Sequence, residues 1–131
     1  MRYNQKKSAD AEQGGISLHY TEKTVEEIKI AYIGGGSRGW AWGLMSDLAS
    51  CSDISGQVAL YDIDLEAAKD NEIIGNLFRR AEGAASDWRY LAVRELKEDL
   101  TGADFVLISI LPGHFDEMES DVHAPEKYGI F

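Results

Sequence analysis

The sequence has little positive charge, a single cysteine and no long apolar run, and each shortage excludes a class of protein. Its 131 residues include 13 Lys and Arg against 23 Asp and Glu, a formal net charge of −10. A surface this acidic repels phosphate backbones and anionic lipid, so neither nucleic-acid nor membrane-surface binding is expected. The lone Cys51 excludes an internal disulfide, and nothing argues for an oxidising compartment. The longest apolar run, residues 105–111, is interrupted by Ser109 and is far shorter than the roughly 20 residues of a transmembrane helix.

The remaining composition is that of a globular protein. Hydrophobic residues make up 44% of the chain and charged residues 27%. Residues 1–7 are not followed by the apolar segment of a secretory signal, so a cytoplasmic protein is expected. Residues 1–25 are polar and are expected to form an N-terminal arm, followed by one folded domain over residues 26–131.

Apolar segments alternate with amphipathic ones along this domain. Strands are predicted over residues 28–33, 58–61, 88–93 and 104–110, and helices over residues 37–50, 65–80 and 95–102 and again after residue 113. Trp40, Leu44 and Leu48 recur at helical spacing, so Trp40 is expected in the core, whereas Trp42 is expected to line a pocket or meet a further domain. Asp64 is expected to cap the second helix.

The alternation predicts an α/β protein with a doubly wound, Rossmann-like parallel sheet in strand order 3-2-1-4. The fourth strand is the most apolar, and its composition is typical of a strand covered on both faces. The predicted order nevertheless leaves it at an edge, where its unpaired backbone groups recruit other chains. We therefore expect an incomplete sheet that belongs to the first part of a longer protein.

A glycine-rich segment between the first predicted strand and helix carries the clearest functional motif. It fits G-x-G-x-x-G and consists of Gly34, Gly35, Gly36, Ser37, Arg38 and Gly39. Gly34 is expected to permit a tight turn, Gly36 the approach of a pyrophosphate, and Gly39 close packing of the helix on the strand. Free amides at the start of the helix then bind the phosphates. A plain glycine-rich turn is the alternative interpretation.

An acid follows at the spacing that the motif requires. Asp62 ends the second predicted strand about 20 residues after the glycines, where a carboxylate binds the ribose hydroxyls of NAD and repels the 2′-phosphate of NADP. Arg38 either contacts the pyrophosphate or is a solvated residue at the helix start.

The loop after the fourth strand lies at the switch point of the predicted sheet, where a nicotinamide would bind. It contains Ile110, Leu111, Pro112 and His114. His114 is either a substrate contact or an exposed loop histidine, and the second interpretation is favoured. Asp121 and His123 are two residues apart and face different sides of a helix, so they do not form a metal pair. Cys51 has no partner histidine and is interpreted as an incidental thiol.

Several of these segments resemble the N-terminal part of glycoside hydrolase family 4. The resemblance is carried by Asp121 and by residues 30–37, 60–64, 103–110 and 125–129. The family comprises NAD- and divalent-metal-dependent α-galactosidases, 6-phospho-glucosidases and α-galacturonidases. Gly-Trp-Ala-Trp at residues 39–42 and Ile-Leu-Pro-Gly at residues 110–113 are most similar to the α-galacturonidase-like branch.

The resemblance implies hydrolysis by oxidation at the sugar C3, removal of the C2 proton, elimination of the glycosidic oxygen and addition of water. It places NAD on the glycine motif, Asp62 and residues 110–112, and a manganese-like metal and the acid and base beyond residue 131. The chain alone is therefore expected to bind NAD and to hydrolyse nothing. Met118 stands where phospho-glucosidases carry an arginine, which favours a neutral sugar or a uronic acid as substrate.

Two further interpretations stay open at this stage. One is the first half of a lactate/malate-type NAD-dependent dehydrogenase, whose sheet begins in the same way. The other is a non-catalytic module that oligomerises through its fourth strand. A homo-oligomer that binds a small sugar is the expectation for the longer protein.

Overall fold

Four parallel strands and one short antiparallel strand form a five-stranded sheet. In the computed structural model, which describes residues 19–21 and 23–130, β2 (Val25–Ile33) lies between β3 (Ile54–Tyr61) and β5 (Phe105–Ile108). The outer strand β4 (Trp88–Val93) pairs with β3. Numbered along the parallel strands, the order is 3-2-1-4, so the predicted doubly wound α/β fold is confirmed.

The segment expected to be an arm contributes a short strand. β1 (His19–Tyr20) pairs antiparallel with the first residues of β2, which begins at Val25. Residues 1–18 and 22 of the expected arm lie outside the described residues. The extent of the domain, residues 26–131, stays a prediction.

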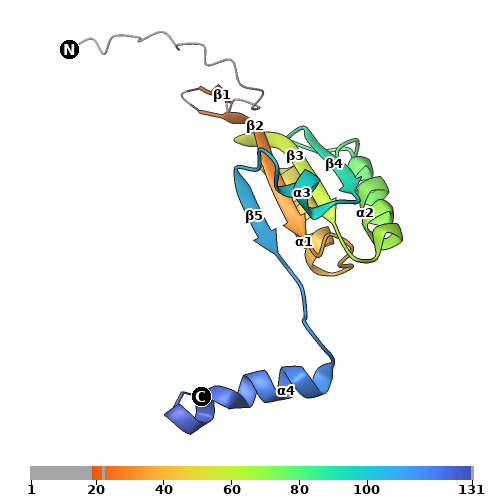
Figure 1. The fold of residues 1–131 in the computed structure, drawn as a ribbon. Coiled ribbons are helices and arrows are strands. Elements are labelled where there is room, and N and C mark those ends of the chain that lie inside the picture. Colours follow the sequence, from red (N-terminus) through yellow and green to blue (C-terminus); the bar gives the residue numbers. More distant parts are fainter. Residues whose placement is uncertain (1–18, 22, 131) are drawn as a thin grey trace, which may run out of the picture.

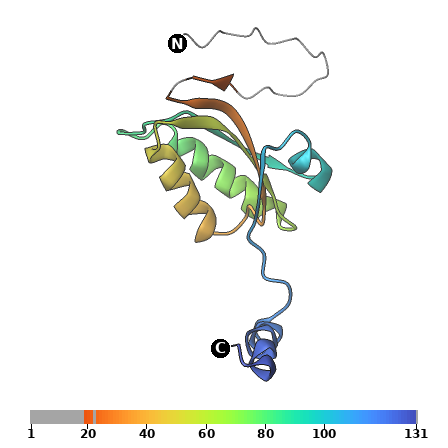
Figure 2. The same ribbon diagram turned by 90° about the vertical axis from the view of Figure 1, so that its left-hand side faces the viewer.

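Helices cover both faces of the sheet (Figure 1). α1 (Trp40–Ser50) and α2 (Leu65–Phe78) lie on one face, and the short α3 (Leu96–Leu100) lies on the other (Figure 2). α4 (Phe115–His123) and the 3₁₀-helix η1 (Ala124–Tyr128) stand apart from the sheet. None of the helices in the described part of the chain is long and apolar enough to span a membrane.

The main core lies between the sheet and α1 and α2. Its largest buried side chains include Met45, Leu60 and Trp88. Trp40, expected in this core, is 77% exposed, so that prediction was wrong. The helix begins at Trp40 rather than at residue 37, and its buried face consists of residues 41, 45 and 48, three positions with helical spacing.

The two edges of the sheet differ. At β4, Asn76 of α2 hydrogen-bonds the backbone N–H and C=O of Tyr90, and a Glu72 carboxylate oxygen accepts the N–H of Ala92. These side chains hydrogen-bond the backbone groups with which a further strand would pair. In contrast, the four residues of β5 are 38–66% exposed, so the expectation of a strand covered on both faces was wrong for the described residues. The open edge of the sheet therefore lies at β5.

The short helix α3 contains a buried acid. Asp99 is fully buried, and both of its carboxylate oxygens are shielded from solvent. Burial raises the pKa of its carboxyl from 3.8 to about 6, although the nearby Lys29 ammonium opposes the rise. Lys29 itself donates to the carbonyls of Glu98 and Thr101 at 3.1 and 2.5 Å, at the end of α3.

We expect Asp99→Asn to change how stability depends on pH. The folded state binds the Asp99 proton more tightly than the unfolded chain, so this group's contribution is complete below about pH 4 and is lost as the pH rises through about 6. The free energy of unfolding of D99N relative to wild type should therefore rise by on the order of 2 kcal/mol between about pH 4 and pH 7. Urea unfolding at several pH values measures it. The exposed Asp70→Asn, with the same charge change, is the control, and equal pH profiles for both variants would contradict the prediction.

Candidate functional site

The glycine loop connects the carboxyl end of β2 to α1, with its first glycine in a conformation that other residues rarely adopt. Gly34 has φ +92°, and a Cβ added there would lie 2.0 Å from the carbonyl oxygen of Ser109, just after β5. The N–H groups of Gly34 and Gly35 both donate to the Tyr61 carbonyl at 2.9 Å. The expected tight turn is confirmed, and it holds the loop against the ends of β3 and β5.

Asp62 lies beside this loop, directly after β3. One of its carboxylate oxygens accepts the N–H of Gly36 at 2.9 Å, and the other accepts the N–H of Asp64 at 2.9 Å. A Cβ on Gly36 would lie 2.9 Å from the Asp62 carboxylate and 2.8 Å from the side chain of Ala67, so glycine is needed there for the approach of Asp62 and α2. Each carboxylate oxygen retains a second acceptor site for a hydroxyl donor.

The last glycine of the motif does not have the packing role that was expected. A Cβ added at Gly39 would meet no atom within 4 Å among the described residues, because α1 starts here on the exposed side of the loop. Gly39 is the N-cap of α1, and no side chain caps this helix end. In the described part of the chain, the backbone N–H groups of the exposed residues 38–40 make no backbone hydrogen bond of the kind found elsewhere in the loop. These amides are the donors that an anion at a helix N-terminus uses.

Sequence reasoning missed Asn71, which lies behind the loop. Asn71 is 2% exposed and shares the buried stripe of α2 with Ala68 and Gly75. Its amide nitrogen donates to the carbonyls of Gly35 and Ser37 at 2.7 and 3.0 Å. The signal was present in the sequence as a polar residue at a core-facing helical spacing.

Three large side chains at the start of α1, those of Arg38, Trp40 and Trp42, are exposed. Arg38 makes no ion pair with any residue that the structure describes, so its role in binding pyrophosphate stays a prediction. The Trp42 indole is 43% exposed, and its N–H donates to the Asn71 side-chain oxygen at 2.8 Å. A hollow of about 560 Å³ lies beside the loop, between α1 and the ends of β2 and β5. This is the switch point where open α/β sheets bind ligands.

The segment after β5 is only partly near this site. The Ile110 side chain lies beside Gly34, because a Cβ added to Gly34 would be 3.2 Å from its methyl carbon. Leu111 and Pro112 are exposed and lead away from the sheet to α4 (Figure 1). His114 is the N-cap residue of α4, and its backbone N–H donates to Glu117 at 2.7 Å. The structure therefore brings Ile110, but not His114, to the glycine loop.

No cluster with metal-binding character is found among the described residues. No group of three or more His, Cys, Asp or Glu side chains there could hold a metal ion. His123 pairs with Glu126 at 2.6 Å rather than with Asp121. Cys51 is half-buried at the C-cap of α1.

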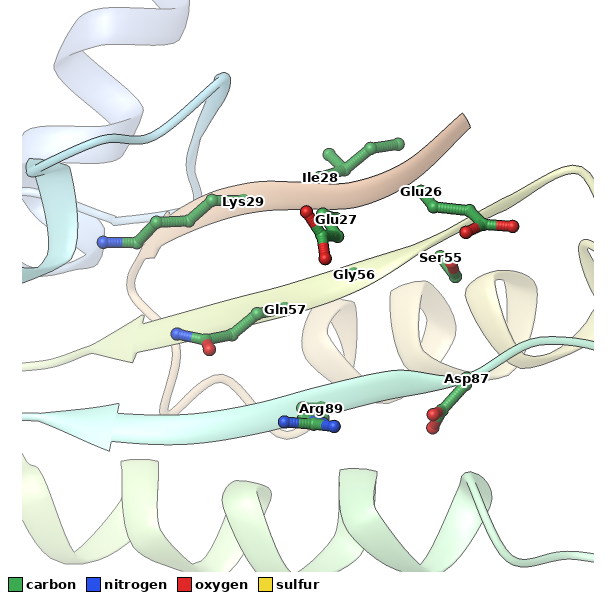
Figure 3. A pocket seen from close by; sticks show the side chains of 9 residues that line it. All are labelled: Glu26, Glu27, Ile28, Lys29, Ser55, Gly56, Gln57, Asp87 and Arg89. Carbon is green, nitrogen blue, oxygen red and sulfur yellow. The ribbon is translucent and has the colours of Figure 1, made fainter. Parts of the chain in front are cut away.

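A second hollow, of about 500 Å³, lies at the opposite end of the sheet (Figure 3). It is lined by Glu26, Glu27, Ile28, Lys29, Ser55, Gly56, Gln57, Asp87 and Arg89. Its lining contains charges of both signs and lies near the amino ends of the strands. Parallel α/β sheets bind their ligands at the carboxyl ends, so the glycine loop is the better candidate site.

The sheet order, the alternating helices and the glycine loop at the switch point define a Rossmann-like α/β protein. The sequence pattern of the family 4 glycosyl hydrolases matches residues 29–131. The chain belongs to this family.

Comparisons with known proteins agree with this assignment. An alpha-galacturonidase from Thermoanaerobacterium saccharolyticum is 64% identical over 114 residues, which are 87% of this chain and 24% of that protein. An alpha-galacturonidase from Bacillus subtilis is 57% identical over 108 residues, 82% of this chain and 23% of that protein. The chain thus spans about a quarter of the length of the curated relatives it matches.

Solved structures share the fold. A crystal structure described as a glucosidase, lplD, from Bacillus subtilis has a TM-score of 0.62 at 58% identity and covers 81% of this chain and 23% of that one. The 6-phospho-beta glucosidase from Thermotoga maritima, solved with manganese, NAD+ and glucose-6-phosphate, has a TM-score of 0.53 at 25% identity, covering 80% and 24%.

Proposed function

We propose that this chain supplies the NAD-binding part of a family 4 glycosidase that acts on α-galacturonides. The observation that carries the proposal is the row of free amides at the exposed residues 38–40, which follows the positive-φ turn at Gly34 and lies at the switch point of the sheet. The alpha-galacturonidases that it resembles support the substrate class.

The residues fit the cofactor in their chemistry. The amides of residues 38–40 would bind the two phosphates, and Asp62 would accept hydrogen bonds from the adenosine ribose hydroxyls. Ile110, which lies beside Gly34, would line the nicotinamide end together with Leu111 and Pro112. NAD, when bound, supplies the redox chemistry that makes the sugar C2 proton acidic. The chain's own residues bind and orient; the metal ligands, acid and base implied by the resemblance are proposed to lie in the longer protein.

Titration calorimetry of the 131-residue chain with NAD and then NADP tests this proposal. We expect NAD to bind at least about tenfold more tightly than NADP, because the Asp62 carboxylate repels a 2′-phosphate. The chain alone should release no sugar from an α-galacturonide. Equal binding of NADP would contradict the role of Asp62, absence of NAD binding would contradict the proposed function, and turnover would contradict the placement of the catalytic groups outside this chain.

A further inference from the structure

The polar groups of Asn71 are all directed at the glycine loop and the first turn of α1. Its two amide hydrogens go to the carbonyls of Gly35 and Ser37, and its oxygen accepts the Trp42 indole N–H. Asn71 is buried, so breaking any of these bonds leaves a polar group without water to replace the partner. Asn71 thus connects the middle of the motif to the first turn of α1.

These bonds determine which way the neighbouring amides face. In a trans peptide the C=O and the following N–H point in opposite directions. Because Asn71 draws the carbonyls of Gly35 and Ser37 toward α2, the N–H groups of Gly36 and Arg38 must point away from it. The Gly36 N–H meets Asp62, and the Arg38 N–H is left as a donor facing out of the loop, without an acceptor among the described residues.

The third bond ties α1 to the same arrangement. Trp42 lies in the first turn of α1, and its indole is held at 2.8 Å by the Asn71 oxygen. The free amides of residues 38–40 therefore keep one orientation relative to Asp62, whose carboxylate accepts the Gly36 N–H. When the donor amides are already fixed in place, ligand binding costs less ordering entropy than when they are mobile.

We propose that Asn71 is a positioning residue that orients the backbone amides of the glycine loop toward the diphosphate of the dinucleotide. The inference rests on the proposed NAD binding and adds a residue on α2 that does not touch the cofactor. An aspartate would have the same shape but could not donate to the two carbonyls, and its charge would lie behind an anion site.

The chain provides a matched control on the same helix. Asn76 also makes three hydrogen bonds, to the Glu72 carbonyl and to the N–H and C=O of Tyr90, but these are at the edge of β4 and not at the loop. Asn71→Asp and Asn76→Asp each replace an asparagine that makes three hydrogen bonds, and each adds one negative charge. Their affinities for NAD and for adenosine, which lacks phosphate, are compared by calorimetry and NMR titration.

We expect N71D to lower NAD affinity by at least about tenfold and adenosine affinity by less than about threefold, while N76D leaves both within about twofold. The N–H resonance of Arg38 should shift in N71D without any ligand and stay in place in N76D. Should N71D fail to fold, Trp42→Phe, at a half-exposed position, removes one of the three bonds and should lower NAD affinity by about threefold with a smaller Arg38 shift.

Equal losses of NAD affinity in N71D and N76D would overturn the inference, because stability alone would then explain both. Unchanged NAD affinity or an unchanged Arg38 resonance in N71D, or in W42F where N71D does not fold, would overturn it as well. If wild type binds no NAD, the proposed function fails and this role fails with it. If wild type binds NAD and N71D binds it equally well, only the role of Asn71 fails.

Discussion

Replacing Gly34 with alanine is expected to lower the free energy of unfolding by about 3 kcal/mol or more. The added methyl group meets two separate obstacles. The backbone has φ +92°, which L-residues rarely adopt, and the new Cβ would lie 2.0 Å from the Ser109 carbonyl oxygen. Because that oxygen is backbone, relief requires the end of β5 to move away from β2. Chemical denaturation measures the stability, and NAD titration should show a loss of more than about tenfold.

Gly83→Ala separates the two obstacles. Gly83 has φ +89°, but a Cβ there would meet no atom within 4 Å among the described residues. This variant carries the conformational cost alone, about 1 kcal/mol. If G34A and G83A destabilise equally, Gly34 does not approach Ser109 as closely as the structure shows.

Asp62→Asn is expected to weaken NAD binding by about tenfold to a hundredfold and to reduce the preference for NAD over NADP. The carboxylate accepts two backbone N–H groups, from Gly36 and Asp64, on its two oxygens. An asparagine has only one oxygen, so its NH₂ group would face one of these donors. The loop then loses a charged hydrogen bond, and the 2′-phosphate of NADP loses a repelling charge.

Asp64→Asn is the matched control, because it removes one negative charge two residues away. Asp64 caps α2 by accepting the N–H of Ala67 at 3.1 Å, a role that asparagine also fills. Calorimetric titration should find D64N within about twofold of wild type for both dinucleotides. If D64N shifts the NAD-to-NADP ratio as much as D62N, general charge rather than the position of Asp62 determines the preference.

The amino-acid sequence by itself was enough to predict the order of the parallel strands and the position of the glycine motif. Apolar β-branched runs at β2 and β5 and the cap at Asp64 are local signals, because strand propensity and capping depend on neighbouring residues. The parallel order 3-2-1-4 followed from right-handed crossovers, a rule that applies to any such alternation. The glycines and Asp62 were recognised by spacing alone.

The contacts between these elements were decided only by the tertiary structure. The spacing of apolar residues predicted that Trp40 lies in the core. In the structure α1 begins at Trp40 and its buried face starts at Ala41, so Trp40 is exposed. The roles of Gly36 and Gly39 depend on what lies opposite each Cβ, which no local pattern contains. Asn71 contacts residues more than 28 positions away along the chain, so its three hydrogen bonds exist only once α2 has packed beside the loop.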